Sequence, residues 1–122
     1  MKPSIAVLDY RLGNTQSVRN ALIRLGCRVT VGRDEKTLMA ADAVVLPGVG
    51  SFNAAMDEIA ALELKPLLDE LALRRKKPFL GICLGMQLIS EESVENGLHR
   101  GLGWLPGRVE MIPATESRRV PH

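Results

Sequence analysis

The chain has 122 residues, a length that suits a single domain with an ordinary core. Hydrophobic residues make up 46% and charged residues 25%, which is typical of a globular protein and excludes a disordered one. Aromatic residues make up only 3%, so we expect a core of aliphatic side chains. The net charge of +2 is too small to argue for nucleic acid or an anionic membrane as a partner.

Membrane insertion, secretion and metal binding find no support in the sequence. The chain has no run of 18 apolar residues, and its N-terminus lacks the apolar segment of a signal peptide. Its two cysteines, Cys27 and Cys83, are far apart and form neither a disulfide framework nor a metal-ligand cluster. We therefore expect a cytoplasmic protein with no metal and no cofactor.

Strands and helices are predicted in alternation along most of the chain. The predicted strands are short apolar or β-branched runs, at residues 5–8, 28–31, 43–46 and 79–82. The predicted helices have apolar residues at helical spacing, in segments 15–25, 34–39, 51–59, 64–75 and 83–89. Two more strands are predicted at 104–105 and 108–112, on either side of a Pro106-Gly107 turn.

This alternation predicts an α/β fold with an open, mostly parallel sheet and helices on both faces. In such folds ligands gather beyond the carboxyl ends of the strands. The three loops expected at that edge, 9–14, 47–51 and 83–87, have an unusual glycine content. The sequence shows no repeat and no linker, so residues 1–122 are interpreted as one domain or part of one.

The segment 81–85, Gly-Ile-Cys-Leu-Gly, has the spacing of a nucleophile elbow between a strand and a helix. Glycines on both sides permit a tight turn and a close approach of neighbouring backbone. Cys83 would lie at a helix N-terminus, where the dipole favours the thiolate. The alternative is a buried core cysteine beside two turn glycines. The glycine-rich loops at the same edge favour the nucleophile.

At this point the sequence resembles the class I (triad) glutamine amidotransferases, and among them the glutaminase subunits of imidazole glycerol phosphate synthase. The matching segments are Asp9-Tyr10 with Gly13-Asn14, residues 46–52 (Leu-Pro-Gly-Val-Gly-Ser-Phe), residues 80–88 around Cys83, and Gly101-Leu102-Gly103 leading to residues 106–109. They cover nearly the whole chain. The resemblance implies the flavodoxin-like sheet of this family.

The resemblance also implies a reaction. Cys83 would attack the side-chain amide of glutamine, form a thioester and expel ammonia, and water would release glutamate. The amide of Leu84 and the amides of Val49 and Gly50 would stabilise the oxyanion. In this family the loop that holds Val49 is productive only when the partner's site is occupied, which makes this amide a switch.

The resemblance further assigns substrate contacts and a partner. Gln87, Glu95 and Gly50 would hold the glutamine substrate, with Glu95 at its α-ammonium. Ammonia would pass to a (β/α)8-barrel synthase subunit, the partner in a heterodimer that makes imidazole glycerol phosphate in histidine biosynthesis.

Each of these residues also has an ordinary structural interpretation. Gln87 fits a helix surface, Glu95 fits a solvated acidic run, and the 47–50 loop fits a plain turn. Cys27 is expected to be inert packing. His99, in a polar loop, is expected to be a surface histidine rather than a catalytic one.

The sequence departs from the family pattern at two places. Arg11 stands where the family usually has a glycine, so the first loop is expected to differ in shape or to carry a new charge toward the site. The family's catalytic His and the Glu that orients it come from a segment past residue 122, and His122 is not that His. We therefore expect an N-terminal part of a longer domain, incomplete at its C-terminus and inactive alone.

Three alternatives remain open from the sequence. The chain is another class I amidotransferase glutaminase, an elbow-cysteine hydrolase, or a catalytically incomplete module that binds a partner.

Overall fold

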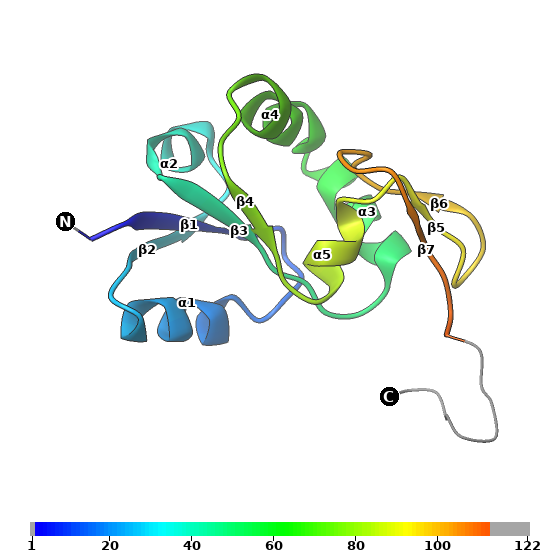
Figure 1. Ribbon diagram of the computed structural model, residues 1–122, viewed down its shortest axis with the longest axis horizontal. Helices are drawn as coiled ribbons and strands as arrows, with labels where there is room; N and C mark the ends of the chain where they lie inside the picture. Colours follow the sequence, from blue (N-terminus) through cyan, green and yellow to red (C-terminus); the bar gives the residue numbers. More distant parts are fainter. Residues whose placement is uncertain (1, 113–122) are drawn as a thin grey trace.

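A computed structural model describes residues 2–112, and its main element is a four-stranded parallel sheet (Figure 1). The strand order is β2-β1-β3-β4, and all three neighbouring pairs are parallel. The strands are β1 (Ser4–Leu8), β2 (Arg28–Gly32), β3 (Ala43–Leu46) and β4 (Phe79–Gly81). All four strands predicted from apolar runs are confirmed.

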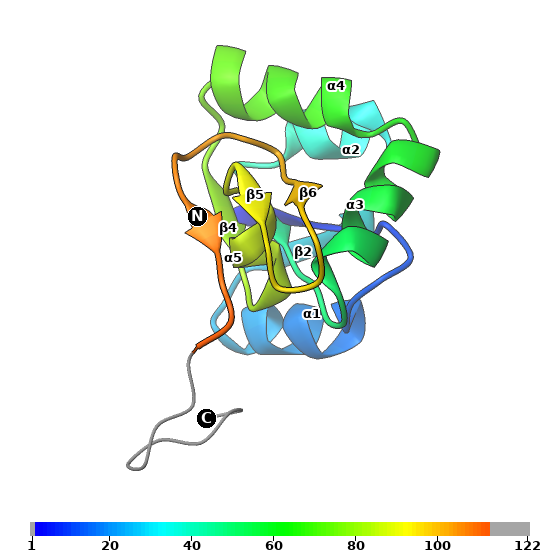
Figure 2. The same cartoon turned by 90° about the vertical axis from the view of Figure 1, so that its right-hand side faces the viewer.

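Helices cover both faces of this sheet, as predicted. The helices are α1 (Thr15–Arg24), α2 (Glu35–Ala40), α3 (Phe52–Ala61), α4 (Lys65–Asp69) with the π-helical turn η1 (Glu70–Arg74), and α5 (Leu84–Leu88). Figures 1 and 2 show α1 on one face and α2 with α4 on the other. Side chains cap three helix starts: Asn14, Asp34 and Ser51 each accept a hydrogen bond from the backbone N–H three residues ahead.

The core is aliphatic, as the composition predicts. Leu8, Leu46, Ile59, Leu68 and Leu88 are fully buried in it. The core lies mainly between the sheet and the helices opposite α1, because α1 has no buried residue. Leu25, an apolar residue at the end of this helix, is 80% exposed. α1 packs mainly against β1 and β2, and its remaining surface faces solvent.

A second, smaller sheet follows α5. It contains β5 (Glu92–Ser93) between β6 (His99–Arg100) and β7 (Arg108–Val109). β5 pairs antiparallel with β6 and parallel with β7. The strand predicted at 108–112 is confirmed for its first two residues, whereas β5 and β6 were not predicted.

The strand predicted at 104–105 is wrong. The backbone N–H groups of Trp104 and Leu105 both donate to the carbonyl oxygen of Ile89, at 3.0 and 3.1 Å, so they are not available to a strand partner. The Trp104 indole N–H donates to Asp69 at 2.7 Å, and its ring meets Phe79 edge-on with centroids 4.9 Å apart. The contacts of the Trp104 side chain with Asp69 on α4 and Phe79 on β4 therefore determine the backbone conformation of this segment.

Strand β2 lies on one side of β1, and β3 lies on its other side. The order in which strands join the sheet therefore reverses between β1 and β3. The loops after β1 and β3 meet at this switch point, where open α/β sheets place their ligands. The Tyr10 hydroxyl donates to the carbonyl oxygen of Pro47 at 2.6 Å, and Tyr10 is completely buried. This hydrogen bond ties the first glycine-rich loop to the second.

We expect a Tyr10→Phe substitution to lower the free energy of unfolding at neutral pH by about 1 kcal/mol, because the Pro47 carbonyl loses its donor. Burial raises the pKa of Tyr10 from 10.0 to about 12. The folded state therefore holds the phenol proton more tightly than the unfolded chain does. The contribution of the protonated Tyr10 to the free energy of unfolding is complete below pH 10 and is lost as the pH rises to 12. The loss amounts to about 2 to 3 kcal/mol.

Urea denaturation of both proteins at pH 9 and pH 12 checks this expectation. The wild-type protein should lose more stability over this range than Tyr10→Phe, since all other titrating groups are common to both. Equal losses in the two proteins would contradict a buried, proton-holding Tyr10.

Candidate active site

The elbow around Cys83 has a strained backbone. β4 ends at Gly81 and α5 begins at Leu84, so the turn from strand to helix takes only two residues. Cys83 has φ 54° and ψ −120°, a combination that side chains with a Cβ rarely adopt. The Ile82 N–H donates to the Leu46 carbonyl at 3.0 Å, which holds the turn against the end of β3. This is the sharp strand-to-helix turn that the glycine spacing predicts.

Two glycines allow backbone to contact backbone at this turn. A Cβ added to Gly81 would lie 2.6 Å from the Met86 Cα, inside the elbow itself. A Cβ added to Gly85 would collide with the carbonyl oxygen of Leu46, on the neighbouring strand. The elbow therefore has this shape only with glycine at both positions.

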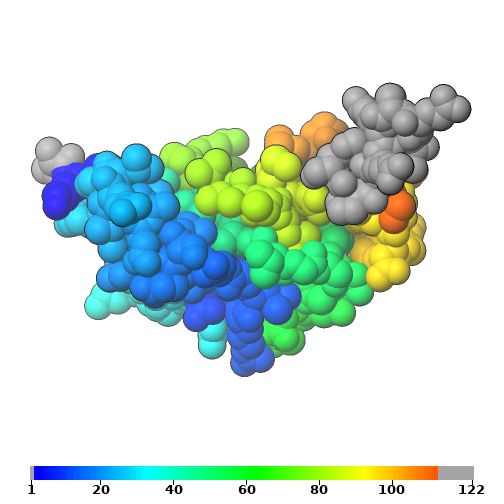
Figure 3. All heavy atoms as spheres, turned by 90° about the horizontal axis from the view of Figure 1, so that it is seen from below, coloured from blue at the N-terminus to red at the C-terminus, as the bar shows by residue number. Residues whose placement is uncertain are grey.

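Cys83 lies in a hollow that also contains four residues predicted from the sequence. The hollow has a volume of about 370 Å³ and is lined by Gly48, Val49, Gly50, Cys83, Leu84, Met86 and Gln87. Cys83 is exposed, and Figure 3 shows the elbow segment (yellow-green) at the surface between α1 (blue) and the segment after β3 (green). The structure thus brings the thiol next to Leu84, Val49, Gly50 and Gln87.

The loop after β3 has a fixed half and a free half. Pro47 and Gly48 are buried, and a Cβ added to Gly48 would lie 2.6 Å from the Tyr10 hydroxyl oxygen. Val49 is 56% exposed, and Gly50 has φ +98° with open space where a Cβ would be. The N–H groups of Leu84, Val49 and Gly50 donate no hydrogen bond to other described residues. They are therefore available to a ligand in the hollow.

A second hollow adjoins the first. It has a volume of about 330 Å³ and is lined by Gly50, Ser51, Phe52, Asn53, Gln87, Ser93, Glu95, Asn96, His99 and Met111. Gly50 and Gln87 line both hollows, so Glu95 lies on the far side of Gln87 from Cys83. The structure brings Glu95 to the site through the loop after β5, although twelve positions separate it from Cys83 in the sequence.

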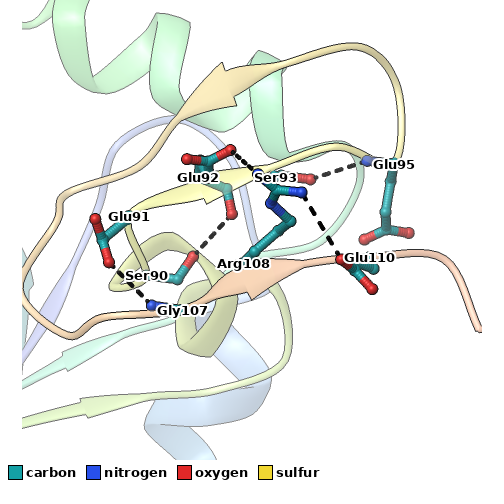
Figure 4. A network of polar contacts seen from close by, with 8 residues as sticks. All are labelled: Ser90, Glu91, Glu92, Ser93, Glu95, Gly107, Arg108 and Glu110. Atoms are coloured by element: carbon teal, nitrogen blue, oxygen red, sulfur yellow. Dashed lines mark hydrogen bonds and ion pairs between the residues drawn. The ribbon is translucent and has the colours of Figure 1, made fainter.

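The acidic residues around β5 have different surroundings (Figure 4). Glu91 accepts a hydrogen bond from the Gly107 N–H at 3.2 Å, and Glu92 forms an ion pair with Arg108 at 3.2 Å. The Glu95 carboxylate forms no ion pair or hydrogen bond within residues 2–112, and only its backbone N–H is engaged, with the Ser93 hydroxyl at 3.4 Å. Glu95 is therefore the acid of this run that remains available to a ligand.

The second hollow also contains polar residues that were not predicted as site residues, among them Asn53, Ser93 and Asn96. The position of Asn53 just after the glycine-rich loop was the one available signal for it. His99 lines this hollow rather than the one around Cys83, and its Nε2 bonds to the Asn96 carbonyl at 2.7 Å. Among residues 2–112, no His, Asp or Glu lines the hollow around Cys83.

Arg11 retains the backbone conformation that a glycine would adopt. Its φ is 74°, and its guanidinium lies 3.6 Å from the Glu58 carboxylate with 58% of the side chain exposed. The first loop therefore accommodates the arginine through strain and a surface ion pair. His122 lies outside the described residues.

Residues 2–112 include neither a metal-binding cluster nor a membrane-spanning helix. Within residues 2–112 no group of three or more His, Cys, Asp or Glu side chains is placed to hold a metal ion. None of the helices there has the length and apolar character needed to cross a membrane.

The parallel sheet, the strained elbow cysteine and the glycine loop define a class of protein. The family model of the class-I glutamine amidotransferases matches residues 6–118, and the chain belongs to this family. A crystal structure of a glutamine amidotransferase superposes with a TM-score of 0.72 at 22% identity, covering 88% of this chain and 56% of that chain. This likeness confirms the predicted fold.

Within the family, the chain is similar to particular curated proteins. It is 44% identical over 119 residues to imidazole glycerol phosphate synthase subunit HisH 2 of Vibrio vulnificus, covering 97% of this chain and 56% of that protein. It is 43% identical over 126 residues to subunit HisH of Zymomonas mobilis, and 48% identical over 118 residues to that of Exiguobacterium sibiricum. The last two alignments cover 98% and 97% of this chain, and 58% of each relative. The chain thus spans little more than half the length of these relatives.

We expect Gly85→Ala to lower the free energy of unfolding by about 3 kcal/mol, because the new Cβ meets a backbone carbonyl that cannot move without displacing β3. Gly26→Ala is the matched control. Gly26 has φ +91° and open space around it, so only backbone strain opposes the substitution, at about 1 kcal/mol. Urea denaturation measures both, and equal losses would show that the elbow does not depend on the contact with Leu46.

Proposed function

We propose that the chain provides the glutaminase site of an imidazole glycerol phosphate synthase, which hydrolyses glutamine to glutamate and ammonia. One observation carries the proposal: Cys83, on a strained elbow, shares a hollow with the unengaged N–H groups of Leu84, Val49 and Gly50 and with Gln87. The similarity to proteins named as subunits of that synthase supports the choice among amidotransferases.

In the proposed reaction the Cys83 sulfur attacks the side-chain amide carbon of glutamine. The C–N bond breaks, the leaving nitrogen takes a proton and departs as ammonia, and a thioester remains on Cys83. Water then attacks the thioester, releases glutamate and returns the thiol. Both steps pass through a tetrahedral oxyanion, for which the N–H of Leu84 and an N–H of the 49–50 segment are suitable donors.

The two adjoining hollows suit an amino acid that carries a side-chain amide. With the amide carbon at Cys83, the α-amino end extends past Gln87 and Gly50 toward Glu95. A carboxylate without an ion-pair partner among the described residues favours the cationic end of the substrate. Gly50, Gln87 and Glu95 are accordingly the proposed substrate contacts.

A base must remove the thiol proton and deliver it to the leaving nitrogen. None of the described residues that line the hollow around Cys83 is a candidate for this role. We propose that a His–Glu pair outside residues 1–122 supplies it, and that the 122-residue chain alone is inactive. The ammonia passes to a (β/α)8-barrel synthase subunit in a heterodimer, with the cytoplasm as the proposed location.

The described lining of this hollow, which includes no base, also fits a second candidate function for the 122-residue chain, a module that binds the synthase subunit without catalysis. A purified 122-residue chain that binds the barrel subunit and forms no thioester with glutamine would support this candidate.

We expect Cys83→Ser to reduce glutamate release by the synthase complex at least about a thousand-fold, because a serine hydroxyl is a far weaker nucleophile in a site built for a thiol. Cys27→Ser is the control and should leave the rate unchanged, since Cys27 lies in neither hollow. Mass spectrometry with an electrophilic glutamine analogue should locate one adduct, on Cys83. Normal turnover by Cys83→Ser would refute the proposed role of the thiol.

A further inference from the structure

Tyr10 contacts the lining of the hollow around Cys83 from its buried side. It is completely buried and does not line the hollow itself. Its hydroxyl donates to the Pro47 carbonyl at 2.6 Å, and a Cβ added to Gly48 would lie 2.6 Å from the hydroxyl oxygen. Gly48 does line the hollow. One residue of backbone therefore separates the Tyr10 hydroxyl from the site.

The elbow contacts Gly48 at the same place as the Tyr10 hydroxyl does. A Cβ added to Gly48 would also lie 3.0 Å from the Leu84 Cβ and 3.1 Å from the Gly85 nitrogen, in the first turn of α5. The Pro47 carbonyl and the Gly48 nitrogen share one planar peptide, so the hydrogen bond from Tyr10 also orients that nitrogen. Gly48 is thus held in a corner that the hydroxyl and the elbow form together.

The peptide after Gly48 carries a proposed oxyanion donor. The N–H of Val49 belongs to the planar peptide that links Gly48 to Val49, and it donates no hydrogen bond to other residues within 2–112. Once the Pro47–Gly48 peptide is fixed, the position of the Val49 nitrogen depends only on φ and ψ of Gly48. The contact with Tyr10 therefore limits where this donor lies.

We infer that Tyr10 is a positioning residue for the proposed glutaminase reaction. Its hydroxyl holds the Pro47–Gly48 peptide against the elbow, so that the Val49 N–H is aimed at the oxyanion formed on attack by Cys83. The inference rests on the proposed function and deepens it. Oxyanion donors act through their placement, so a displaced donor stabilises the transition state less. The loss of the hydroxyl should therefore slow the chemical step and leave substrate binding nearly unchanged.

The test measures glutamate release by the synthase complex that contains the full subunit, in the wild type and in Tyr10→Phe. We expect Tyr10→Phe to lower kcat about 10- to 100-fold, because removal of a whole oxyanion donor costs about 100- to 1,000-fold and this donor is displaced rather than removed. KM for glutamine should change by less than about two-fold, since Gln87 and Glu95 lie on other segments.

Two reagents separate the oxyanion site from the thiol. With the aldehyde analogue of glutamine, the Cys83 sulfur adds to the carbonyl carbon, and the former carbonyl oxygen takes up the thiol proton and occupies the oxyanion site. Its affinity should fall by the same factor as kcat. Iodoacetamide alkylates the thiol: the S–C bond forms, iodide leaves and the proton passes to solvent, without an oxyanion. The rate of alkylation of Cys83, measured by mass spectrometry, should change by less than about two-fold.

Trp104→Phe is the matched control for a general loss of stability. It also removes a side-chain hydrogen bond, from the indole N–H to Asp69 at 2.7 Å, and Trp104 lines neither hollow. We expect it to leave kcat, KM and the affinity for the aldehyde unchanged. Thermal unfolding of each variant confirms that the assays are made on folded protein.

Several results would overturn the inference. They are an unchanged kcat in Tyr10→Phe, an equal loss of kcat in Trp104→Phe, an undiminished affinity for the aldehyde, or a parallel fall in the rate of alkylation. An active wild type with any of these results overturns the role of Tyr10 alone. A wild-type complex that does not hydrolyse glutamine overturns the proposed function and this inference together.

Discussion

The elbow of this protein rests on the end of β3 with backbone against backbone, and the geometry of the site depends on that contact. No side chain fits between Gly85 and the Leu46 carbonyl, and the Ile82 N–H donates to the same oxygen. The separation between Cys83 and the loop after β3 is therefore set by main-chain atoms. This separation does not change when side chains around the hollow move between rotamers.

The loop after β3, on the other side of the hollow, has one buried half and one exposed half. Tyr10 and the first turn of α5 hold its buried half, because a Cβ added to Gly48 would lie 2.6 Å from the Tyr10 hydroxyl and 3.0 Å from the Leu84 Cβ. Its exposed half, Val49 and Gly50, has no comparable contact. The proposed oxyanion donors of this loop thus lie in the half that does not pack against the core.

The sequence predicted the parallel sheet and the elbow because both leave local signals. Buried parallel strands are short, continuous apolar runs, and the elbow requires glycines at fixed distances from Cys83. The small second sheet has two-residue strands, too short for any periodicity, and its order depends on contacts such as the ion pair between Arg108 and Glu92. The second hollow joins the start of α3 to the loop after β5, so the proximity of Asn53 and Glu95 is purely tertiary.

The strain in this chain is distributed unevenly. Within residues 2–112, four non-glycine residues have positive φ, and two of them, Glu63 and Lys76, follow α3 and η1 at the position where helices commonly end in a left-handed residue. No helix end explains the other two, Arg11 and Cys83, which lie in the loops after β1 and β4. Strained backbone persists where the surrounding structure enforces it and where a ligand can use it. Its concentration beyond the carboxyl ends of β1 and β4 is therefore an argument for function that does not depend on similarity to any other protein.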